Sequence, residues 1–372
     1  MIKSLSVRNV RSLSGGASDF REFAFSHGVN VIHGPNGCGK TTVLEAVHLL
    51  SQGFSFRARD LKELIAWNAD EMILRGSFYD ESHEWNRALQ VGSAGTVVKE
   101  NGSPLRAASS FFGKMPAVIM QPSDIELLRG APEVRRRWLD EILCFRSAAN
   151  ASVLRNYKRV LQQRNQWLRQ FKKDGNAVGG EDLFVVLTGQ LVELGAKLWS
   201  IRLELSKEIS PIITGYYRRL SGGVDEITCD YKSSILREFD ESGTPNEDML
   251  KNAFAEKLAG LEVVEKLQGI TMSGPHKDDL ALCASGYEMR SVGSQGQCRS
   301  AAIAMRFAAV DVASRYLAKP VLLLDDIFAE LDVNRRDAVA ALVREKDCQV
   351  LIATPQFEEL PFMADQKISL RN

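Results

Sequence analysis

The sequence predicts an α/β fold with an inserted helical subdomain, and three observations carry that prediction. A glycine-rich loop, Gly34 to Thr42, lies between an apolar run typical of a buried strand and a run with helical spacing. A second apolar run, Val321 to Leu324, ends in two adjacent carboxylates, Asp325 and Asp326. Residues from about 132 to 217, between these motifs, show helical periodicity. We expect both motifs in one core, which the helical segment therefore interrupts.

The glycine-rich loop matches the phosphate-binding (P-loop) pattern of two glycines around four residues, followed by Lys and Thr. Its residues are Gly34, Pro35, Asn36, Gly37, Cys38, Gly39, Lys40, Thr41 and Thr42. Glycines let successive N–H groups converge on an anion, and the next helix adds the positive end of its dipole. We predict an ATP site in which Lys40 lies between the terminal phosphates and the Thr41 hydroxyl binds Mg²⁺. The alternative is a glycine-rich turn that binds nothing. Cys38 is interpreted as a small filler, not a nucleophile.

Composition indicates an ordinary globular protein of 372 residues, with 45% hydrophobic and 25% charged residues and no net charge. No run of about 18 apolar residues occurs, and Met1 to Ser4 leads straight into a strand-like pattern. We expect a cytoplasmic protein with no membrane partner. The six cysteines lie far apart, so neither a zinc site nor a disulfide framework is predicted.

Positive charge gathers in one part of the chain. From Arg129 to Lys173 there are twelve Lys and Arg against three Asp and Glu. Such a local excess on helices is typical of nucleic-acid binding. The triplet Arg135, Arg136 and Arg137 is the candidate for direct contact with DNA; alternatively, these arginines form ion pairs within the helical segment.

Local patterns predict the elements in order. We expect strands at residues 2–10 and 23–25, strand-like runs over 70–105 with a hairpin turn at Asn101-Gly102, and a buried strand at 116–120. Leucines from Leu187 to Leu205 recur in steps of four and three, which predicts a helical hairpin of about three heptads. Further elements are a helix at 247–267, a turn at 274–280, a helix from Ser294 to Leu317, a helix at 334–344 and a final strand at 349–354. The predicted division is a core of residues 1–125 and 268–372, with an antiparallel subsheet at about 70–120, and an inserted helical subdomain at 126–267.

The acidic pair after the second apolar run has the position of a Walker B motif. Asp325, at the end of its strand, is the candidate Mg²⁺ ligand, and Asp326 is the candidate for polarising the attacking water. Two adjacent acids can instead cap the next helix. Gln121, in the loop after the strand at 116–120, is a further candidate contact to Mg²⁺ and water.

Ser294-Gln295-Gly296-Gln297 opens a helix whose free N–H groups could face an anion. Alone it indicates only a helix cap. With the other motifs it completes the set of an ATP-binding-cassette (ABC) ATPase, in which such a helix closes over nucleotide held by a second subunit. Transporter ATPases place a switch His after the strand that follows Walker B. Here Ala353-Thr354-Pro355 occupies that place, and His276, in a turn, is interpreted as structural.

Several segments resemble the RecF family of bacterial DNA replication and repair proteins, relatives of the SMC-type ATPases. They are Asn9 to Arg11, Gly34 to Thr41, Ser55 to Arg57, Pro122 to Asp124, Gly130 to Pro132, Arg135 to Asp140, Gly274 to Leu280, Ser294 to Gln297 and Leu323 to Asp332. The resemblance implies an ABC-type ATPase head that binds ATP and Mg²⁺, with Ser294, Gly296 and Gln297 contacting ATP across a homodimer. Two features depart from the family pattern: Cys298 replaces a second Gln, and Gln121 to Asp124 is looser than usual.

The resemblance also implies partners and activity. The partners are double-stranded DNA at gaps or single-strand/double-strand junctions, RecR and RecO, with RecA loading as the outcome. DNA stimulates ATP hydrolysis, which then releases the DNA. The residues themselves predict slow hydrolysis, since Asp rather than the longer Glu stands at position 326 and the switch His is missing. Arg11 and Arg57 become candidates for phosphate contacts, or else plain surface arginines. The remaining alternatives are a transporter ATPase subunit, an SMC-like structural ATPase that tethers DNA, and a small-molecule kinase, which would leave Ser294 to Gln297 unexplained.

Overall fold

The computed structural model describes residues 1–13, 19–80, 82–223, 226–235, 245–355, 357, 360–361 and 363–370. They form two compact units. Unit 1 comprises Met1–Asp124, Arg219–Ser221 and Met305–Asn372, and unit 2 comprises Ile125–Arg218 and Gly222–Ala304. The predicted division into a core (1–125 and 268–372) and an insertion (126–267) stays a proposal. The segment Ser242-Gly243-Thr244-Pro245, whose sequence predicts a loop, falls mostly outside the described residues.

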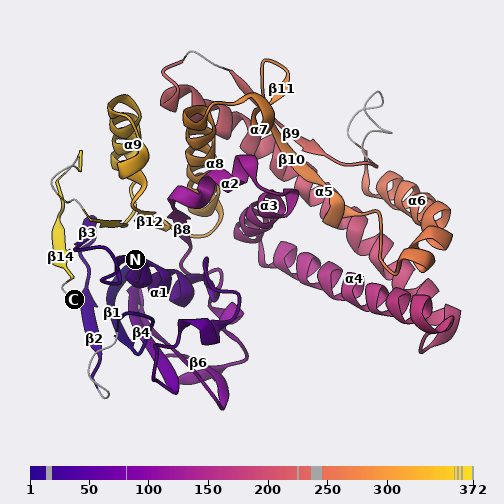
Figure 1. The fold of residues 1–372 in the computed structure, drawn as a ribbon, viewed down its shortest axis with the longest axis horizontal. Coiled ribbons are helices and arrows are strands. Elements are labelled where there is room, and N and C mark those ends of the chain that lie inside the picture. Colours follow the sequence, from indigo (N-terminus) through magenta and orange to yellow (C-terminus); the bar gives the residue numbers. More distant parts are fainter. Residues whose placement is uncertain are drawn as a thin grey trace. The chain divides into compact units, whose positions relative to one another are not determined.

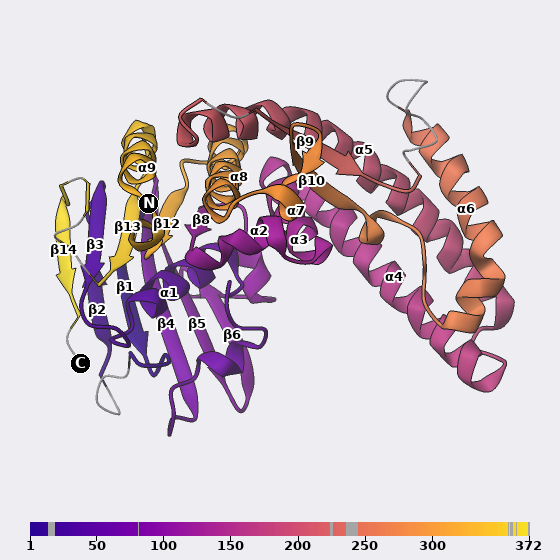
Figure 2. The ribbon, with the colours of Figure 1, turned by 45° about the horizontal axis from the view of Figure 1, so that its top comes forward.

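Unit 1 contains two sheets with helix α1 (Lys40–Gln52) between them (Figures 1 and 2). Nearly every residue of α1 is buried, because the helix contacts strands of both sheets. The antiparallel sheet has the order β2-β1-β4-β5-β6-β7. Its strands are β1 (Ile2–Arg8), β2 (Arg21–Ala24), β4 (Glu71–Tyr79), β5 (Glu84–Gly92), β6 (Gly95–Glu100) and β7 (Ser103–Leu105). Alternate residues of β4, such as Met72 and Leu74, point into the core, as the period of two requires.

The second sheet of unit 1 is parallel, with the order β14-β3-β13-β12-β8. Its strands are β3 (Val29–His33), β8 (Ala117–Met120), β12 (Val321–Asp325), β13 (Val350–Thr354) and β14 (Gln366–Ser369). The strands β8, β12 and β13 are continuous apolar runs because both faces of a parallel sheet are covered. The prediction that 349–354 is the last strand was wrong. β14 follows it and pairs with β3, and its alternating burial is that of an edge strand with weak apolar character.

Four short helices and one longer helix, α9, also belong to unit 1. They are η1 (Leu61–Leu64), η2 (Ala108–Phe111), η3 (Pro122–Ile125), η6 (Ile327–Glu330) and α9 (Val333–Glu345). Helix α8 (Gln295–Tyr316) contains the boundary between the units, since its residues from Met305 onward belong to unit 1.

The described residues of unit 2 are mainly helical and form one small sheet (Figures 1 and 2). Its helices are α2 (Glu126–Arg129), α3 (Pro132–Arg146), α4 (Ala148–Asp174), α5 (Gly180–Leu220), α6 (Glu247–Gln268), η5 (Pro275–Lys277) and α7 (Met289–Val292). The antiparallel sheet has the order β11-β10-β9 and consists of β9 (Ile227–Lys232), β10 (Asp279–Ala284) and β11 (Tyr287–Glu288). The sequence did not predict β9. A buried ion pair, Arg164 to Glu265, joins α4 to α6 at 2.7 Å.

Helix α5 is the one helix of the described residues that is long and apolar enough to cross a membrane. All but its last two residues belong to unit 2. Leu191, Leu198 and Trp199 are fully buried, and the Trp199 ring meets Phe254 of α6 edge-on, with 4.7 Å between ring centroids. The Arg164 guanidinium of α4 donates to Thr188 Oγ1 at 3.0 Å. These contacts are those of a core helix.

Candidate functional site

The P-loop connects β3 to α1, and its backbone requires glycine. Gly34, Gly37 and Gly39 have φ angles of 155°, 86° and 97°. A Cβ at Gly34 would lie 2.2 Å from the Leu370 carbonyl oxygen, and one at Gly39 would lie 2.5 Å from Leu13 Cδ2. Any side chain at these two positions would strain the backbone and clash, so the loop can form only with glycine there.

The other residues of the P-loop are either exposed to solvent or buried. Pro35 and Asn36 are exposed with Gly37, whereas Cys38 and Thr42 are buried. Lys40 folds back over the loop, and its Nζ donates to the carbonyl oxygens of Gly34 and Pro35 at 2.8 and 2.9 Å. The ammonium group is therefore held inside the loop, where a phosphate would have to meet it.

Thr41 and Asp325 are in direct contact. Thr41 Oγ1 donates to Asp325 Oδ1 at 2.8 Å, so the loop and the end of β12 meet at one point. Burial raises the pKa of Asp325, while the hydrogen bond from Thr41 and the charge of Arg57 act in the opposite direction. The site thus contains a carboxylate whose negative charge is poorly solvated and which a cation would stabilise.

Asp326 and Gln121 lie at the same carboxyl edge of the parallel sheet. Asp326 has a left-handed backbone, with φ 51°, and its N–H donates to the Ala353 carbonyl oxygen at 2.9 Å. The pKa of Asp326 is raised above its ordinary value because the carboxyl group is partly buried, although the positive charge of Lys40 acts in the opposite direction. Met120 of β8 pairs with Leu324 of β12, so Gln121 leaves its strand beside Asp325. Ligands bind at this edge in open α/β sheets.

A residue that the sequence analysis gave no role holds the Gln121 loop. Asp124 Oδ2 accepts from the Gln121 N–H at 2.9 Å, and Asp124 Oδ1 accepts from Arg306 Nη2 at 2.6 Å. Asp124 and Arg306 are both buried. The available signal was the spacing, since an Asp three residues after Gln121 can close a turn.

Glu45 is the second residue that sequence reasoning missed. It lies on α1 and is 1% exposed. Its carboxylate forms ion pairs with Arg11 Nε at 3.0 Å and with Arg57 Nη1 at 3.9 Å. Ser55 Oγ donates to the same carboxylate at 2.5 Å. Arg11 has a left-handed backbone, with φ 46°, which is strained for this residue type. Both candidate phosphate-binding arginines are therefore tied to one buried carboxylate; the signal was a charged residue within an apolar helical run.

The donors at the Thr41–Asp325 contact fit Mg²⁺ bound with a nucleotide. Mg²⁺ prefers oxygen ligands and usually combines one or two carboxylates with waters and substrate phosphates. Thr41 and Asp325 supply a hydroxyl and a carboxylate. No group of three His, Cys, Asp or Glu side chains that could hold a metal is found in the described part of the chain.

Ser294, Gly296 and Gln297 form the N-terminus of α8, in unit 2. The Ser294 N–H donates to Gln297 Oε1 at 2.9 Å, and the Gln297 N–H donates to Ser294 Oγ at 3.2 Å. This is a capping box, with Ser294 exposed to solvent. Cys298 is fully buried, with Sγ 3.7 Å from the carbonyl oxygens of Met289 and Gly293, so its substitution for Gln lies on the covered side of the helix.

The three arginines of α3 have different environments. Arg135 is 3% exposed and donates to both carboxylate oxygens of Asp279 at 2.7 and 2.8 Å. Arg136 Nη1 donates to the Asp278 carbonyl oxygen at 2.6 Å. The Arg137 side chain is 78% exposed, with Glu133 at 3.3 Å. The guanidinium of Arg135 is thus bonded within unit 2, and Arg136 donates one of its hydrogen bonds there. DNA contact therefore stays a proposal mainly for Arg137.

His276 lies in a buried polar network. Its Nδ1 is 2.7 Å from the Tyr157 hydroxyl and its Nε2 is 3.2 Å from the Thr271 carbonyl oxygen. Burial lowers the pKa of His276 to about 4. Neighbouring Asp278 accepts from Tyr231 at 2.7 Å. These contacts stabilise unit 2 and give His276 the environment of a structural residue.

Comparison with known proteins agrees with this geometry. The model of the RecF/RecN/SMC N-terminal domain matches residues 1–370. The chain is 35% identical over 343 residues to the DNA replication and repair protein RecF of Geobacter sulfurreducens, covering 92% of this chain and 90% of that one. It is 31% identical over 331 residues to RecF of Bacillus subtilis, covering 89% and 88%.

Solved structures give the same result. The recombination mediator protein RecF with ATP, from the RecFOR pathway, has a TM-score of 0.86 at 27% identity and covers 100% of this chain and 97% of its own. An Smc head bound to the C-winged helix domain of ScpA has a TM-score of 0.58 at 16% identity, which shows a shared fold alone; the match covers 99% and 93%.

The fold and these matches define an ABC-type ATPase head of the RecF/RecN/SMC class. Within that class, the chain belongs to the RecF family. The predicted fold class and the predicted family are confirmed.

Proposed function

We propose that the chain is an ATPase of DNA replication and recombinational repair, which binds duplex DNA as an ATP-bridged homodimer. The contact between Thr41 and Asp325 carries the proposal, because it joins the phosphate loop to the metal carboxylate. The similarity to RecF structures solved with ATP, and to relatives named as DNA replication and repair proteins, supports ATP binding and a role in DNA repair.

Each site residue has a proposed role. Lys40 and the P-loop N–H groups hold the phosphates, and Thr41 and Asp325 hold Mg²⁺, which supplies charge neutralisation for phosphoryl transfer when bound. Asp326 and Gln121 orient the attacking water. Arg11 and Arg57 contact phosphates. Ser294, Gly296 and Gln297 of a second copy cover the nucleotide.

Hydrolysis is slow in this proposal, and DNA stimulates it. Asp326 is shorter than a Glu and reaches less far toward a water, and no His follows β13. We expect a turnover number near or below the low end of the usual range of about 1 to 1,000 per second. Turnover of hundreds per second without DNA would contradict this.

DNA binding is supported by the exposed face of α4. Arg155, Arg159, Arg169 and Lys173 are exposed and recur at helical spacing, with only polar Gln162 and Gln166 between them on that face. Such a basic stripe suits phosphate contacts, which make binding sensitive to salt. In line with the family, the DNA that is bound contains a gap or a single-strand/double-strand junction. The partners are RecR and RecO, and the outcome is RecA loading. The protein acts in the cytoplasm.

Two other functions are less well supported. An SMC-like tether needs arms of hundreds of residues, whereas α4 and α5 have 27 and 41 residues. A transporter subunit needs a switch His at the end of β13, where Ala353-Thr354-Pro355 stands instead.

Sedimentation velocity tests the proposal. The protein is compared with ATP, with ADP and without nucleotide, together with Lys40→Arg and Ser294→Arg. We expect dimers only with ATP and monomers for both variants, with ATP affinity lost in Lys40→Arg and retained in Ser294→Arg. A protein that stays monomeric at high ATP, yet binds duplex DNA equally well, would overturn the proposal.

A further inference from the structure

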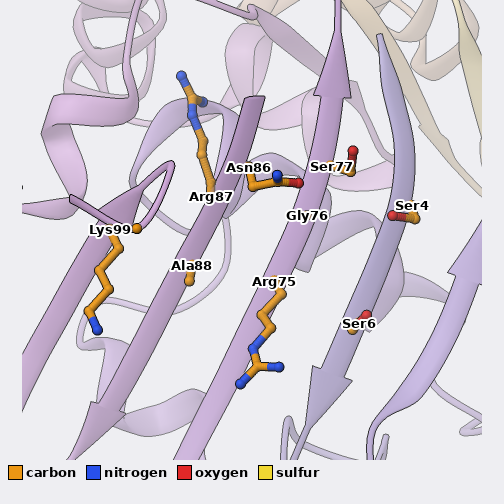
Figure 3. A pocket seen from close by; sticks show the side chains of 10 residues that line it. Ser4, Ser6, Arg75, Gly76, Ser77, Asn86, Arg87, Ala88 and Lys99 are labelled. Carbon is orange, nitrogen blue, oxygen red and sulfur yellow. The ribbon is translucent and has the colours of Figure 1, made fainter. Parts of the chain in front are cut away.

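The outer face of the antiparallel sheet in unit 1 contains a polar groove of about 280 Å³ (Figure 3). Its polar lining consists mainly of Ser4, Ser6, Arg75, Ser77, Asn86 and Lys99, on β1, β4, β5 and β6. None of these residues belongs to the nucleotide site, and no motif in the sequence pointed to them.

Strand register explains why a groove forms here. Ser6, Arg75, Ala88 and Lys99 are successive Cα partners across the four strands. Adjacent strands lie about 4.8 Å apart, so Arg75 and Lys99 originate roughly 10 Å apart. The small Ala88 lies between them, and Figure 3 shows the two long cationic side chains extending on either side of it.

The second row of the groove supplies uncharged hydrogen-bonding groups. Ser4, Ser77 and Asn86 are successive partners beside the first row. Ser77 Oγ donates to Glu84 Oε1 at 2.9 Å, and Lys3 Nζ neutralises that carboxylate at 2.8 Å. The hydroxyl and amide groups therefore line a surface whose nearest acid already has a cationic partner.

The two groove cations are unbalanced. Arg75 and Lys99 are exposed, and neither has a carboxylate partner among the residues that the structure describes. Two further acids of these strands also have cationic partners: Glu71 pairs with Arg8 at 2.6 Å, and Glu100 on β6 pairs with Arg87 at 3.1 Å. Glu22 on β2 begins the row on the far side of Ser6 and does not line the groove. The groove itself thus presents positive charge.

Arg75 is held ready for a ligand. Its guanidinium lies over the Phe20 ring, 4.4 Å from the centroid. This stacking orients the plane without using its N–H donors, so less rotamer entropy is lost when an anion binds.

We propose that this groove binds the sugar–phosphate backbone of nucleic acid. Phosphate contacts in protein–nucleic acid complexes come from Arg, Lys, Ser and Asn side chains, which is the set found here. A protein partner would favour an aromatic or large apolar anchor, and the groove lining has none. The inference rests on the proposed DNA-binding function and adds a contact surface to it.

The test measures duplex DNA affinity with ATP over a series of salt concentrations. The variant Arg75→Gln/Lys99→Gln is compared with Lys62→Gln/Lys232→Gln, which removes two exposed charges elsewhere. We expect roughly tenfold weaker binding and a log–log salt slope smaller by about 1.8 for the groove variant only, since each phosphate contact contributes about 0.9.

Further variants test the shape of the groove separately from its charge. Ala88→Trp fills the groove without changing charge and should weaken binding, whereas Val97→Trp, on the same face but outside the groove, should not. Glu22→Gln should strengthen binding slightly. Thermal unfolding and ATP affinity confirm that each variant is folded.

The outcomes are distinguishable. If the unaltered protein does not bind duplex DNA with ATP, the proposed function fails, and this inference fails with it. If the unaltered protein binds and the groove variant matches it in affinity and salt slope, the inference alone is overturned. It is also overturned if the groove variant loses binding only to a poly-glutamate peptide probe, because the groove would then serve an acidic protein segment.

Discussion

Thr41 Oγ1 lies 2.8 Å from Asp325 Oδ1, although 284 positions of sequence separate the two residues. The contact exists because β3 and β12 both pair with β13, so the loop after one strand and the end of the other meet at one edge of the parallel sheet. Two segments near opposite ends of the chain thus form one site, and the segment between them has room for a second compact unit.

The first prediction concerns the carboxylate of this pair. Asp325→Asn should reduce Mg²⁺-dependent ATP affinity at least roughly tenfold, because the metal loses a charged ligand. The variant should be as stable as the parent without nucleotide, or melt up to about 3 °C higher, since burial raises the pKa of Asp325 and its charge therefore costs stability at neutral pH. ATP titration with and without Mg²⁺, and thermal unfolding, measure both effects.

Thr41→Ser is the matched control, because it keeps the hydroxyl and should bind Mg²⁺ and ATP nearly as well as the parent. Equal Mg²⁺ dependence in Asp325→Asn and the parent would remove Asp325 from the metal site.

The second prediction concerns Glu45. Glu45→Gln should lower the free energy of unfolding by about 2–4 kcal/mol, because Arg11 and Arg57 would lose their shared buried carboxylate. We also expect weaker ATP binding, as the arginines would no longer be held beside the P-loop helix. Urea unfolding and ATP titration test this. The control Glu133→Gln breaks an exposed pair with Arg137 and should change stability by less than about 1 kcal/mol. Normal ATP affinity in Glu45→Gln would show that the cluster is structural only.

Sequence reasoning identified the features that depend on local pattern. The P-loop, the apolar strand before Asp325 and the long helices of unit 2 each follow from residue type and spacing. Asp124 and Glu45 had only weak local signals, because the importance of both residues comes from partners at Arg306, Arg11 and Arg57 that only the tertiary structure brings near. The small strand β9 escaped for a similar reason: its pairing with β10 joins residues about 50 positions apart, and its own pattern is short.

The third prediction is a pH dependence of stability. His48 and His276 are buried, and burial lowers the pKa of each to about 4, below the ordinary value of 6.5. Protonation therefore favours the unfolded state. The stabilising contribution is complete above about pH 6.5 and is lost as pH falls toward 4, by an amount on the order of 3 kcal/mol for each residue.

His276→Gln tests the share of one histidine. The variant should be less stable at pH 7.5 but should lose less stability between pH 6.5 and 4.5, because one of the two protonation events is removed. Urea unfolding at several pH values measures this difference. An unchanged pH profile would mean that His276 is not held neutral.

The fourth prediction concerns Cys298 at the start of α8. Its side chain is fully buried against the carbonyl groups of Met289 and Gly293. Cys298→Gln should destabilise this chain by about 1–3 kcal/mol, because the longer polar side chain does not fit the space. Cys298→Ala should cost less. If Cys298→Gln were as stable as the parent and dimerised more readily with ATP, the residue at position 298 would act on the strength of the dimer contact.

The last prediction separates two neighbouring arginines that the sequence treats alike. Arg135→Ala should destabilise unit 2 by about 3–5 kcal/mol, because the Asp279 carboxylate would lose both charge-assisted hydrogen bonds in a largely buried place. Arg137→Ala should change stability by less than about 1 kcal/mol, since its pair with Glu133 is exposed.

For DNA binding, the expected order of the two effects is reversed. If Arg137 contacts a phosphate, Arg137→Ala reduces the salt slope of duplex binding by about 0.9 and weakens binding to all sequences alike. Arg135→Lys, which keeps the charge but not the paired donors, should still lose stability and leave the salt slope unchanged. A slope that changes with Arg135→Lys but not with Arg137→Ala would place the phosphate contact at the buried residue, which the bidentate pair to Asp279 does not permit without rearrangement of α3 and β10.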